Sequence, residues 1–126
     1  MHHSRLIGFI IDCQTGEPAA ATAFWSAALG MPARPSPSEK YLILDAGVRD
    51  LDIEVQAVEH ESRVHLDIQS DDVEAEVARL EKLGAKRLPQ THKGTWFVME
   101  APTGQRFCVV RARRDISNDP GINKWP

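Results

Sequence analysis

Apolar positions along the first half of the chain fall into short runs separated by turn residues, which is the pattern of β-strands. These runs occupy residues 6–13, 41–45 and 51–58. An alanine-rich segment at 19–29 has helical character and ends at Gly30, a residue suited to the left-handed position after a helix. Three prolines between 31 and 40 limit that stretch to a weak edge strand. The predicted order is strand, helix, weak strand, strand, strand.

The second half repeats this order. Residues 64–68 alternate, with Val64, Leu66 and Ile68 on one strand face and His65 and Asp67 on the other. The remaining predicted elements are a helix at 73–83, a weak strand at 85–88, and strands at 95–100 and 106–112. Each half therefore reads as one βαβββ unit.

Matching segments of the two halves are separated by 54 or 55 residues, as from Leu29 to Leu83 and from Tyr41 to Trp96. Self-similarity at a fixed period indicates a duplicated unit whose copies bury apolar surface together. The sequence predicts one α+β domain over residues 1–126, made of two tandem βαβββ modules with curved sheets that form a cleft. We expect module one at about 5–58, module two at about 63–112, and an irregular tail at 113–126.

Composition narrows the class of protein. Hydrophobic residues make up 42% and charged residues 26% of the 126 positions, as in a soluble globular protein. The net charge of −3 gives no basic surface for nucleic acid or an anionic membrane. No apolar stretch reaches the roughly 20 residues that span a bilayer, and no secretory signal is visible, so we expect a cytoplasmic protein. Cys13 and Cys108 are expected to be free thiols, and His2 and His3, which are either the remnant of a tag or native residues, are not expected in the site.

Several motifs carry a family resemblance. They are His65-Leu66-Asp67-Ile68, the acidic helix start Asp71-Asp72-Val73-Glu74, and the closing segment Trp96-Phe97-Val98-Met99-Glu100-Ala101-Pro102-Thr103-Gly104 with Phe107-Cys108-Val109. Together they resemble the vicinal oxygen chelate superfamily, which includes glyoxalase I, bleomycin-resistance proteins and extradiol dioxygenases. The best match is to its glyoxalase-like subgroup without an assigned reaction, over roughly residues 5–112.

The resemblance implies where a divalent metal would bind. Metal-dependent members take four ligands from the first and last strands of both modules. Those positions fall on His65, near Gly8, on Glu54 and on Cys108, with Gln56 replacing Glu54 if the alignment slips by two residues. A metal-bound Glu54 would also be the catalytic base in glyoxalase chemistry.

This ligand set is incomplete, because Gly8 has no side chain and Cys108 stands where active glyoxalases carry glutamate. We therefore expect no cofactor, while zinc, nickel, iron or manganese bound by His65 and Glu54 stays an alternative. His65, Gln56, Cys108 and Trp96 are the predicted contacts of a ligand. Each has a structural alternative: a hydrogen-bonded histidine, a cavity-lining amide, a small buried thiol and a packing indole.

Three functions follow from this assessment. The first is a glyoxalase-like protein that binds a small organic ligand in the cleft between the modules without a complete metal site. The second is a metal-dependent lyase, isomerase or dioxygenase. The third is a non-catalytic dimeric interaction protein. The resemblance also implies a homodimer, and the sequence predicts no nucleic-acid or membrane partner.

Overall fold

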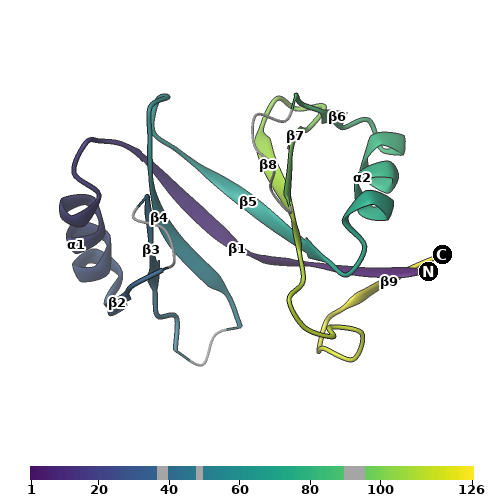
Figure 1. Cartoon of the computed structure of the whole chain (residues 1–126), viewed down its shortest axis with the longest axis horizontal. Coiled ribbons are helices and arrows are strands. Elements are labelled where there is room, and N and C mark those ends of the chain that lie inside the picture. The colour runs from purple at the N-terminus through teal and green to yellow at the C-terminus, as the bar shows by residue number, and fades with distance from the viewer. Residues whose placement is uncertain (37–39, 48–49, 90–95) are drawn as a thin grey trace. The chain divides into compact units, whose positions relative to one another are not determined.

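The computed structural model describes residues 1–36, 40–47, 50–89 and 96–126. The chain divides into two compact units, one formed by Gly8–His65 and the other by Met1–Ile7 with Leu66–Pro126. The unit that contains the termini is called the terminal unit below, and Gly8–His65 is called the inner unit. Each unit combines one helix with a mixed sheet (Figure 1), so the predicted α+β class is confirmed.

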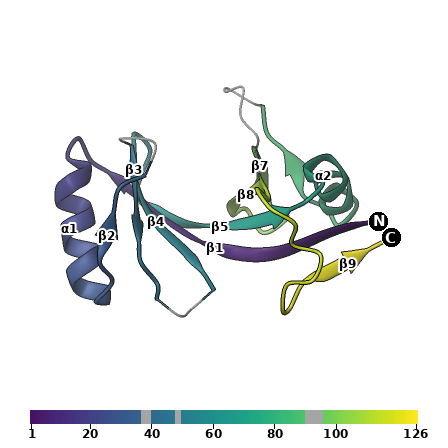
Figure 2. The ribbon, with the colours of Figure 1, turned by 60° about the horizontal axis from the view of Figure 1, so that its bottom comes forward.

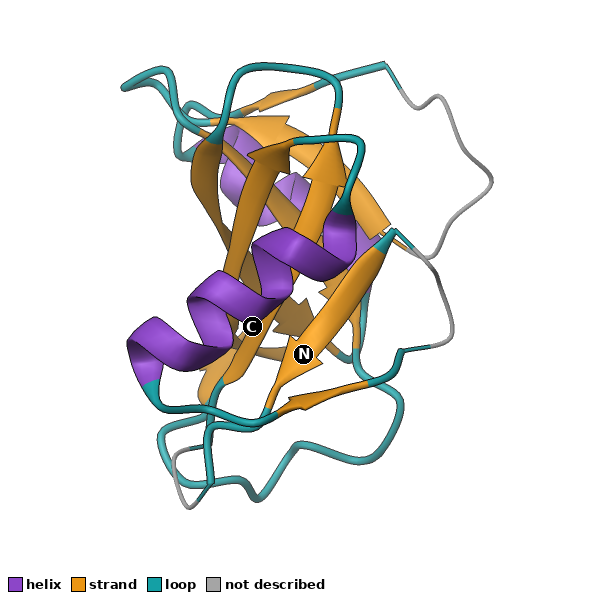
Figure 3. Ribbon diagram, turned by 90° about the vertical axis from the view of Figure 1, so that its left-hand side faces the viewer, coloured by secondary structure: helices purple, strands orange, loops and turns teal. Residues whose placement is uncertain are grey.

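In the inner unit, helix α1 covers one face of a small sheet (Figure 3). The elements are β1 (His2–Gln14, of which the inner unit holds the second half), α1 (Pro18–Leu29), β2 (Ala33–Arg34), β3 (Tyr41–Leu44) and β4 (Asp52–Val58). The strand order is β2-β3-β4-β1, with β1 and β4 parallel and the other pairs antiparallel. Pro18 begins the helix, and Gly30 ends it with φ 67°, as the sequence predicted.

The terminal unit repeats this arrangement and adds one strand (Figure 2). Its elements are β5 (Arg63–Ser70), α2 (Val73–Lys82), β6 (Lys86–Arg87), β7 (Trp96–Glu100), β8 (Arg106–Arg111) and β9 (Asn123–Trp125). The order is β5-β8-β7-β6, with β5 and β8 parallel. Thr95, predicted to start β7, lies outside the described residues. Of the described residues, neither helix is long and apolar enough to cross a membrane.

Helix α2 owes its position to an N-terminal cap and an apolar stripe. The Asp72 carboxylate accepts a hydrogen bond from the backbone N–H of Ala75 at 3.0 Å, which satisfies one of the donors at the helix start. The apolar stripe of α2 consists of Val73, Val77 and Leu80, and it packs in the buried core against Met99 of β7 and Val109 of β8. Burial of each such side chain contributes about 1.5–3 kcal/mol.

The registers of the two sheets confirm the internal repeat. In the inner unit, Glu54 pairs with Ile10 on one side and Ile43 on the other. In the terminal unit, Cys108 pairs with Asp67 and Val98 in the same way. Glu54 and Cys108 are thus equivalent positions, as the sequence spacing predicted.

The tail is not wholly irregular, which corrects the prediction. β9 pairs antiparallel with the start of β1, with Trp125 opposite His2. The Trp125 indole N–H donates to Ser4 Oγ at 2.9 Å, and the Arg79 guanidinium lies 3.9 Å from the indole ring. The segment has no strand pattern of its own, so its conformation depends on the exposed edge that β1 offers it.

His2 and His3 are part of the fold, although no pattern in the sequence indicated this role. His2 Nε2 lies 2.7 Å from Glu76 Oε2, and His3 Nδ1 lies 2.7 Å from Asp71 Oδ2. The Glu76 side chain is fully buried and also accepts hydrogen bonds from Ser4 and Arg79. These contacts join the first residues of β1 to α2.

We predict that Glu76→Ala lowers the free energy of unfolding by about 3–5 kcal/mol, because it leaves the buried partners of the carboxylate without an acceptor. Urea denaturation measures this loss. Glu74→Ala is the matched control on the same helix, since its side chain is 68% exposed and its pair with Arg87 should contribute less than about 1 kcal/mol. Equal losses in the two variants would contradict the prediction.

The lowered pKa of Glu76 predicts that the loss of stability in Glu76→Ala depends on pH. Burial raises the pKa of Glu76, but hydrogen bonds from Arg79 and His2 and the Arg79 charge outweigh burial, so the pKa lies below its ordinary value of 4.5. A carboxyl with a lowered folded pKa stabilises the protein above its unfolded pKa, and this contribution is lost as the pH falls through the folded value. The stability gap between wild type and Glu76→Ala should therefore narrow below pH 4.5.

Candidate functional site

One face of the inner sheet packs on α1 and the other carries the candidate site residues. Cys13 hydrogen-bonds with Trp25 of α1, so the odd-numbered residues at the end of β1 face the helix. Burial raises the pKa of the Cys13 thiol above its ordinary value, which fits this position. Ile10 and Asp12 therefore lie on the opposite face of β1.

The register places two predicted site residues on that opposite face. Glu54 lies beside Ile10, and Gln56 lies beside Asp12. On its other side, Gln56 pairs with Tyr41 of β3, and Glu54 pairs with Ile43. The face therefore carries two neighbouring rows of side chains. The apolar row has the Glu54 carboxylate at its centre, and the polar row consists of Asp12, Gln56 and Tyr41.

His65 contacts the polar row through Asp12. Its Nδ1 lies 2.7 Å from Asp12 Oδ2, and the two side chains are 12% and 2% exposed. The Arg63 guanidinium is more distant, with its Nε 3.9 Å from the same oxygen. An ionised carboxylate only accepts hydrogen bonds, so this contact assigns the proton to Nδ1 of His65.

Asp12 is the site residue that sequence reasoning missed. The pattern of residues 6–13 predicts an apolar strand, although Asp12 is a charged residue within it. A carboxylate inside a buried strand is costly unless it is paired, and this is the signal that could have identified it. Its second oxygen, Oδ1, is buried and has no hydrogen-bond partner in the part of the chain that the structure describes.

Gly8 is the residue near which the family resemblance places a metal ligand, and the backbone explains why it is glycine. A Cβ atom at this position would lie 1.7 Å from the backbone oxygen of Asp52. No side chain fits there without moving β4 away from β1. The strand pair itself thus excludes a ligand at Gly8.

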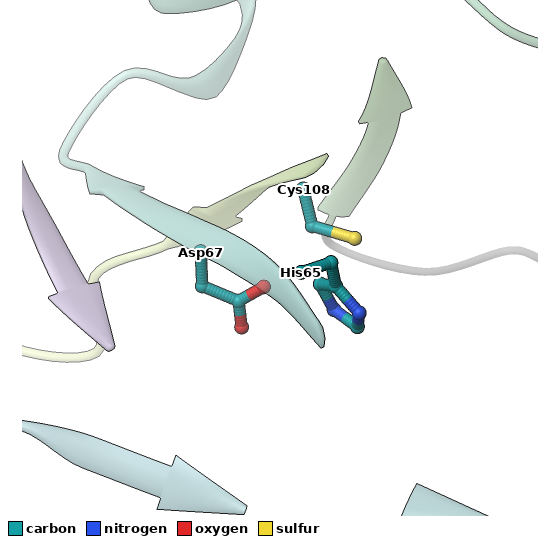
Figure 4. Close-up of side chains that lie close together, drawn as sticks. All are labelled: His65, Asp67 and Cys108. Atoms are coloured by element: carbon teal, nitrogen blue, oxygen red, sulfur yellow. The ribbon is translucent and has the colours of Figure 1, made fainter. Parts of the chain in front are cut away.

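A second group of polar side chains lies on β5 and β8. One ligand atom each from His65, Asp67 and Cys108 lies within 4.8 Å of the others (Figure 4). The sequence left the facing of Cys108 open. Val109 packs in the core beside α2, so Cys108 lies on the opposite face of β8.

These three donors fit a divalent ion by chemistry and spacing. Zinc accepts nitrogen, oxygen and sulfur donors together and often keeps a fourth position for water or substrate. The set differs from the predicted one, because Asp67 takes part and Glu54 is not in the group found among the described residues. A bound ion would act as a Lewis acid toward a substrate oxygen.

Trp96 belongs to the terminal unit. It begins β7 opposite Val110, and its residue surface is 39% exposed. An exposed indole at a strand end offers a flat surface for stacking.

Comparison with known proteins identifies the family. The family model of the glyoxalase-like domain matches residues 8–110. The chain belongs to the glyoxalase-like domain family. No protein of curated function matches this glyoxalase-like chain.

Solved structures share the fold of this glyoxalase-like protein. The NAD-dependent benzaldehyde dehydrogenase structure from Legionella pneumophila aligns with a TM-score of 0.64 at 15% identity, covering 83% of this chain and 97% of the other. Methylmalonyl-CoA epimerase from Mycobacterium tuberculosis gives 0.58 at 14%, covering 86% and 88%. A glyoxalase/bleomycin resistance protein/dioxygenase superfamily member from Vibrio splendidus 12B01 gives 0.56 at 15%, covering 86% and 99%.

These matches confirm the resemblance to the vicinal oxygen chelate superfamily that the motifs predicted. At such low identity they establish the fold and leave the reaction open, because one fold supports many chemistries.

We predict that Gly8→Ala lowers the free energy of unfolding by about 1–3 kcal/mol or more, because the new methyl group overlaps the Asp52 backbone. Thermal and urea unfolding measure the loss. Gly16→Ala is the matched control, since a Cβ atom there meets nothing within 4 Å, and it should change stability by less than about 1 kcal/mol. A Gly8→Ala protein as stable as the control would contradict this account of the strand pair.

Proposed function

We propose that this glyoxalase-like protein binds a small organic molecule at the sheet face that carries His65, without requiring a complete metal site. The observation that supports the proposal is the contact between His65 Nδ1 and the buried Asp12 carboxylate. It fixes the ring in one orientation, and an oriented polar group beside apolar surface is what small-molecule sites use for specificity.

The surrounding residues supply complementary chemistry. Gln56 can donate and accept hydrogen bonds. We propose Glu54 as the catalytic base, and it lies between Ile10 and Ile43 on the same face of the sheet. We propose Trp96 as a stacking surface and Cys108 as a further contact near His65. The ligand expected at such residues is small, planar and partly apolar.

A screen of small aromatic and planar compounds by thermal shift tests this proposal. We expect a binder to raise the melting temperature of the wild type, and His65→Ala to abolish that shift. Lys124→Ala, on β9 of the terminal unit, is the control and should retain the shift. A shift of equal size in His65→Ala would place the ligand elsewhere, and the proposal would fail.

A metal-dependent lyase, isomerase or dioxygenase is the second candidate, and the group His65, Asp67 and Cys108 favours it. Metal analysis of the purified, tag-free protein distinguishes the two. The first proposal predicts well below one zinc, nickel, iron or manganese ion per chain. One ion per chain, lost in both His65→Ala and Cys108→Ser, would instead support the second candidate.

We also propose that the protein is a cytoplasmic homodimer that associates through α1. No residue of Pro18–Leu29 is charged, yet Phe24 is 63% and Leu29 is 43% exposed. A helix that is apolar on its exposed side is typical of an interface. Two copies of a neutral face can meet without burying an unpaired charge.

Light scattering tests the interface. We predict a dimer for the wild type and a monomer for Phe24→Glu, because the new carboxylates would be buried against each other. Leu83→Glu is the matched control, since Leu83 is 66% exposed but lies at the end of α2. A dimer that survives Phe24→Glu would exclude α1 from the interface.

A further inference from the structure

A cavity of about 220 Å³ lies in the terminal unit, where α2 meets the first residues of β1 and β9 (Figure 1). An apolar cavity of about 150 Å³ can hold one benzene ring, so this cavity has room for a small ring compound. Six of the residues that line it are His2, Ala75, Ala78, Arg79, Lys82 and Trp125.

One side of α2 forms the floor of the cavity. Residues 75, 78, 79 and 82 follow the i, i+3, i+4, i+7 spacing, so they share one side of the helix, opposite its apolar stripe. The short side chains of Ala75 and Ala78 leave the space, and Arg79 and Lys82 supply two basic groups. The helix thus presents methyl groups and positive charges to the same cavity.

Arg79 is held in place without a ligand. Its Nε and Nη2 donate to the two carboxylate oxygens of Glu76 at 3.0 and 2.6 Å. The guanidinium lies 3.9 Å from the centre of the Trp125 ring, and the indole N–H in turn donates to Ser4. Arg79 Nη1 has no hydrogen-bond partner among the described residues. Because the side chain is already ordered, a ligand that binds Nη1 loses little free energy in immobilising it.

Lys82 supplies a positive charge without a neighbouring counter-ion. It makes no ion pair in the part of the chain that the structure describes, whereas Glu76 balances the charge of Arg79. The C-terminal end of a helix carries only roughly half a negative charge, which is less than the charge of one lysine. Arg79 and Lys82 are one helical turn apart, so their donors can contact the two oxygens of one carboxylate.

The remaining lining is mostly apolar. The methyl groups of Ala75 and Ala78 and the indole of Trp125 offer surface without charge. His2, 4% exposed, is fixed by the 2.7 Å contact between its Nε2 and Glu76. Apolar lining with a few ordered polar groups at one end is the composition of a small-molecule site.

We infer that this cavity binds small apolar carboxylates. The carboxylate contacts Arg79 Nη1 and the Lys82 ammonium group, and the apolar body packs against Ala75, Ala78 and Trp125. None of these residues belongs to the site proposed around His65, so this second site does not depend on that proposal.

Titration with benzoate and benzamide tests the ligand class, because the two compounds have nearly the same shape and differ in charge. NMR spectra of the histidine rings report both affinity and place, since His2 lines the cavity. The wild type should bind benzoate at least about tenfold more tightly than benzamide, because only the carboxylate forms charge-assisted hydrogen bonds with both basic groups. The His2 ring signals should shift to saturation, and those of His60 and His65 should stay where they are.

Lys82→Gln tests the role of the charge. It should weaken benzoate binding about tenfold and leave benzamide binding unchanged, because it removes one ionic partner of the carboxylate. Lys86→Gln is the matched control. It removes the same charge from β6, which does not line the cavity, and it should keep the affinity for benzoate.

Ala78→Leu tests the place of binding in a second way. Ala78 is exposed on α2, and leucine is a strong helix former, so the protein should keep its fold and its melting temperature. The larger side chain occupies the cavity, and binding of both compounds should be lost while Arg79 and Lys82 remain.

A preference for benzoate that shifts His2, disappears in Lys82→Gln and persists in Lys86→Gln supports the inference. Benzoate that moves the His65 signals rather than those of His2 would place the compound at the other site and overturn it. Equal affinities of the wild type for the two compounds, or no binding of benzoate, would overturn it as well. An equal loss in the two lysine variants, or full binding in a folded Ala78→Leu protein, would do the same.

Discussion

Parallel pairing of the first and last strands within each unit is the constraint on which the rest of this structure depends. β1 lies parallel to β4, and β5 lies parallel to β8. Parallel neighbours cannot be joined by a tight turn, so the intervening chain must cross the sheet and return. In both units a helix makes this crossing and covers one face. Every candidate site residue on these four strands therefore shares the face that the helix leaves uncovered.

The close approach of the strands carries a chemical consequence. Because β1 passes the Asp52 backbone at Gly8, no side chain fits at this residue, near which the family resemblance places a metal ligand. The polar chemistry of the inner unit lies further along β1, at Asp12. A carboxylate there orients His65, whose ring supplies one of the three donor atoms grouped on β5 and β8. The same imidazole thus belongs to a hydrogen-bonded pair and to a possible metal site, and its Nδ1 hydrogen bond is compatible with either use.

The terminal unit uses its buried polar groups differently. Glu76 accepts hydrogen bonds from β1 and from its own helix, and Trp125 adds β9 through Ser4. A fully buried carboxylate is tolerated when its lone pairs are satisfied in this way. The network joins the first and last residues of the described chain to α2, so the polar residues near both ends act as structural residues. The Asp12 carboxylate is less completely satisfied, because its Oδ1 has no hydrogen-bond partner among the described residues.

Local physics determined much of this protein from the sequence alone. Local signals in the sequence include the proline at the start of α1, Gly30 at its end and the alternation along β5. The spacing of the internal repeat also predicted that Glu54 and Cys108 are equivalent positions, and the strand registers agree. Strand registers follow from these patterns because a shift of one residue would expose the core. The α+β class and the family were therefore predictable.

Tertiary structure alone decided the pairing of polar groups distant in sequence. Asp12 and His65 are 53 residues apart, and His2 and Glu76 are 74 apart, so no local pattern links them. β9 has no strand pattern and exists only because β1 offers it an edge. The face of Cys108 likewise depended on which side of β8 packs against α2. A buried polar group is stable only with its partner in place, and that partner is supplied by the folded chain rather than by its neighbours in sequence.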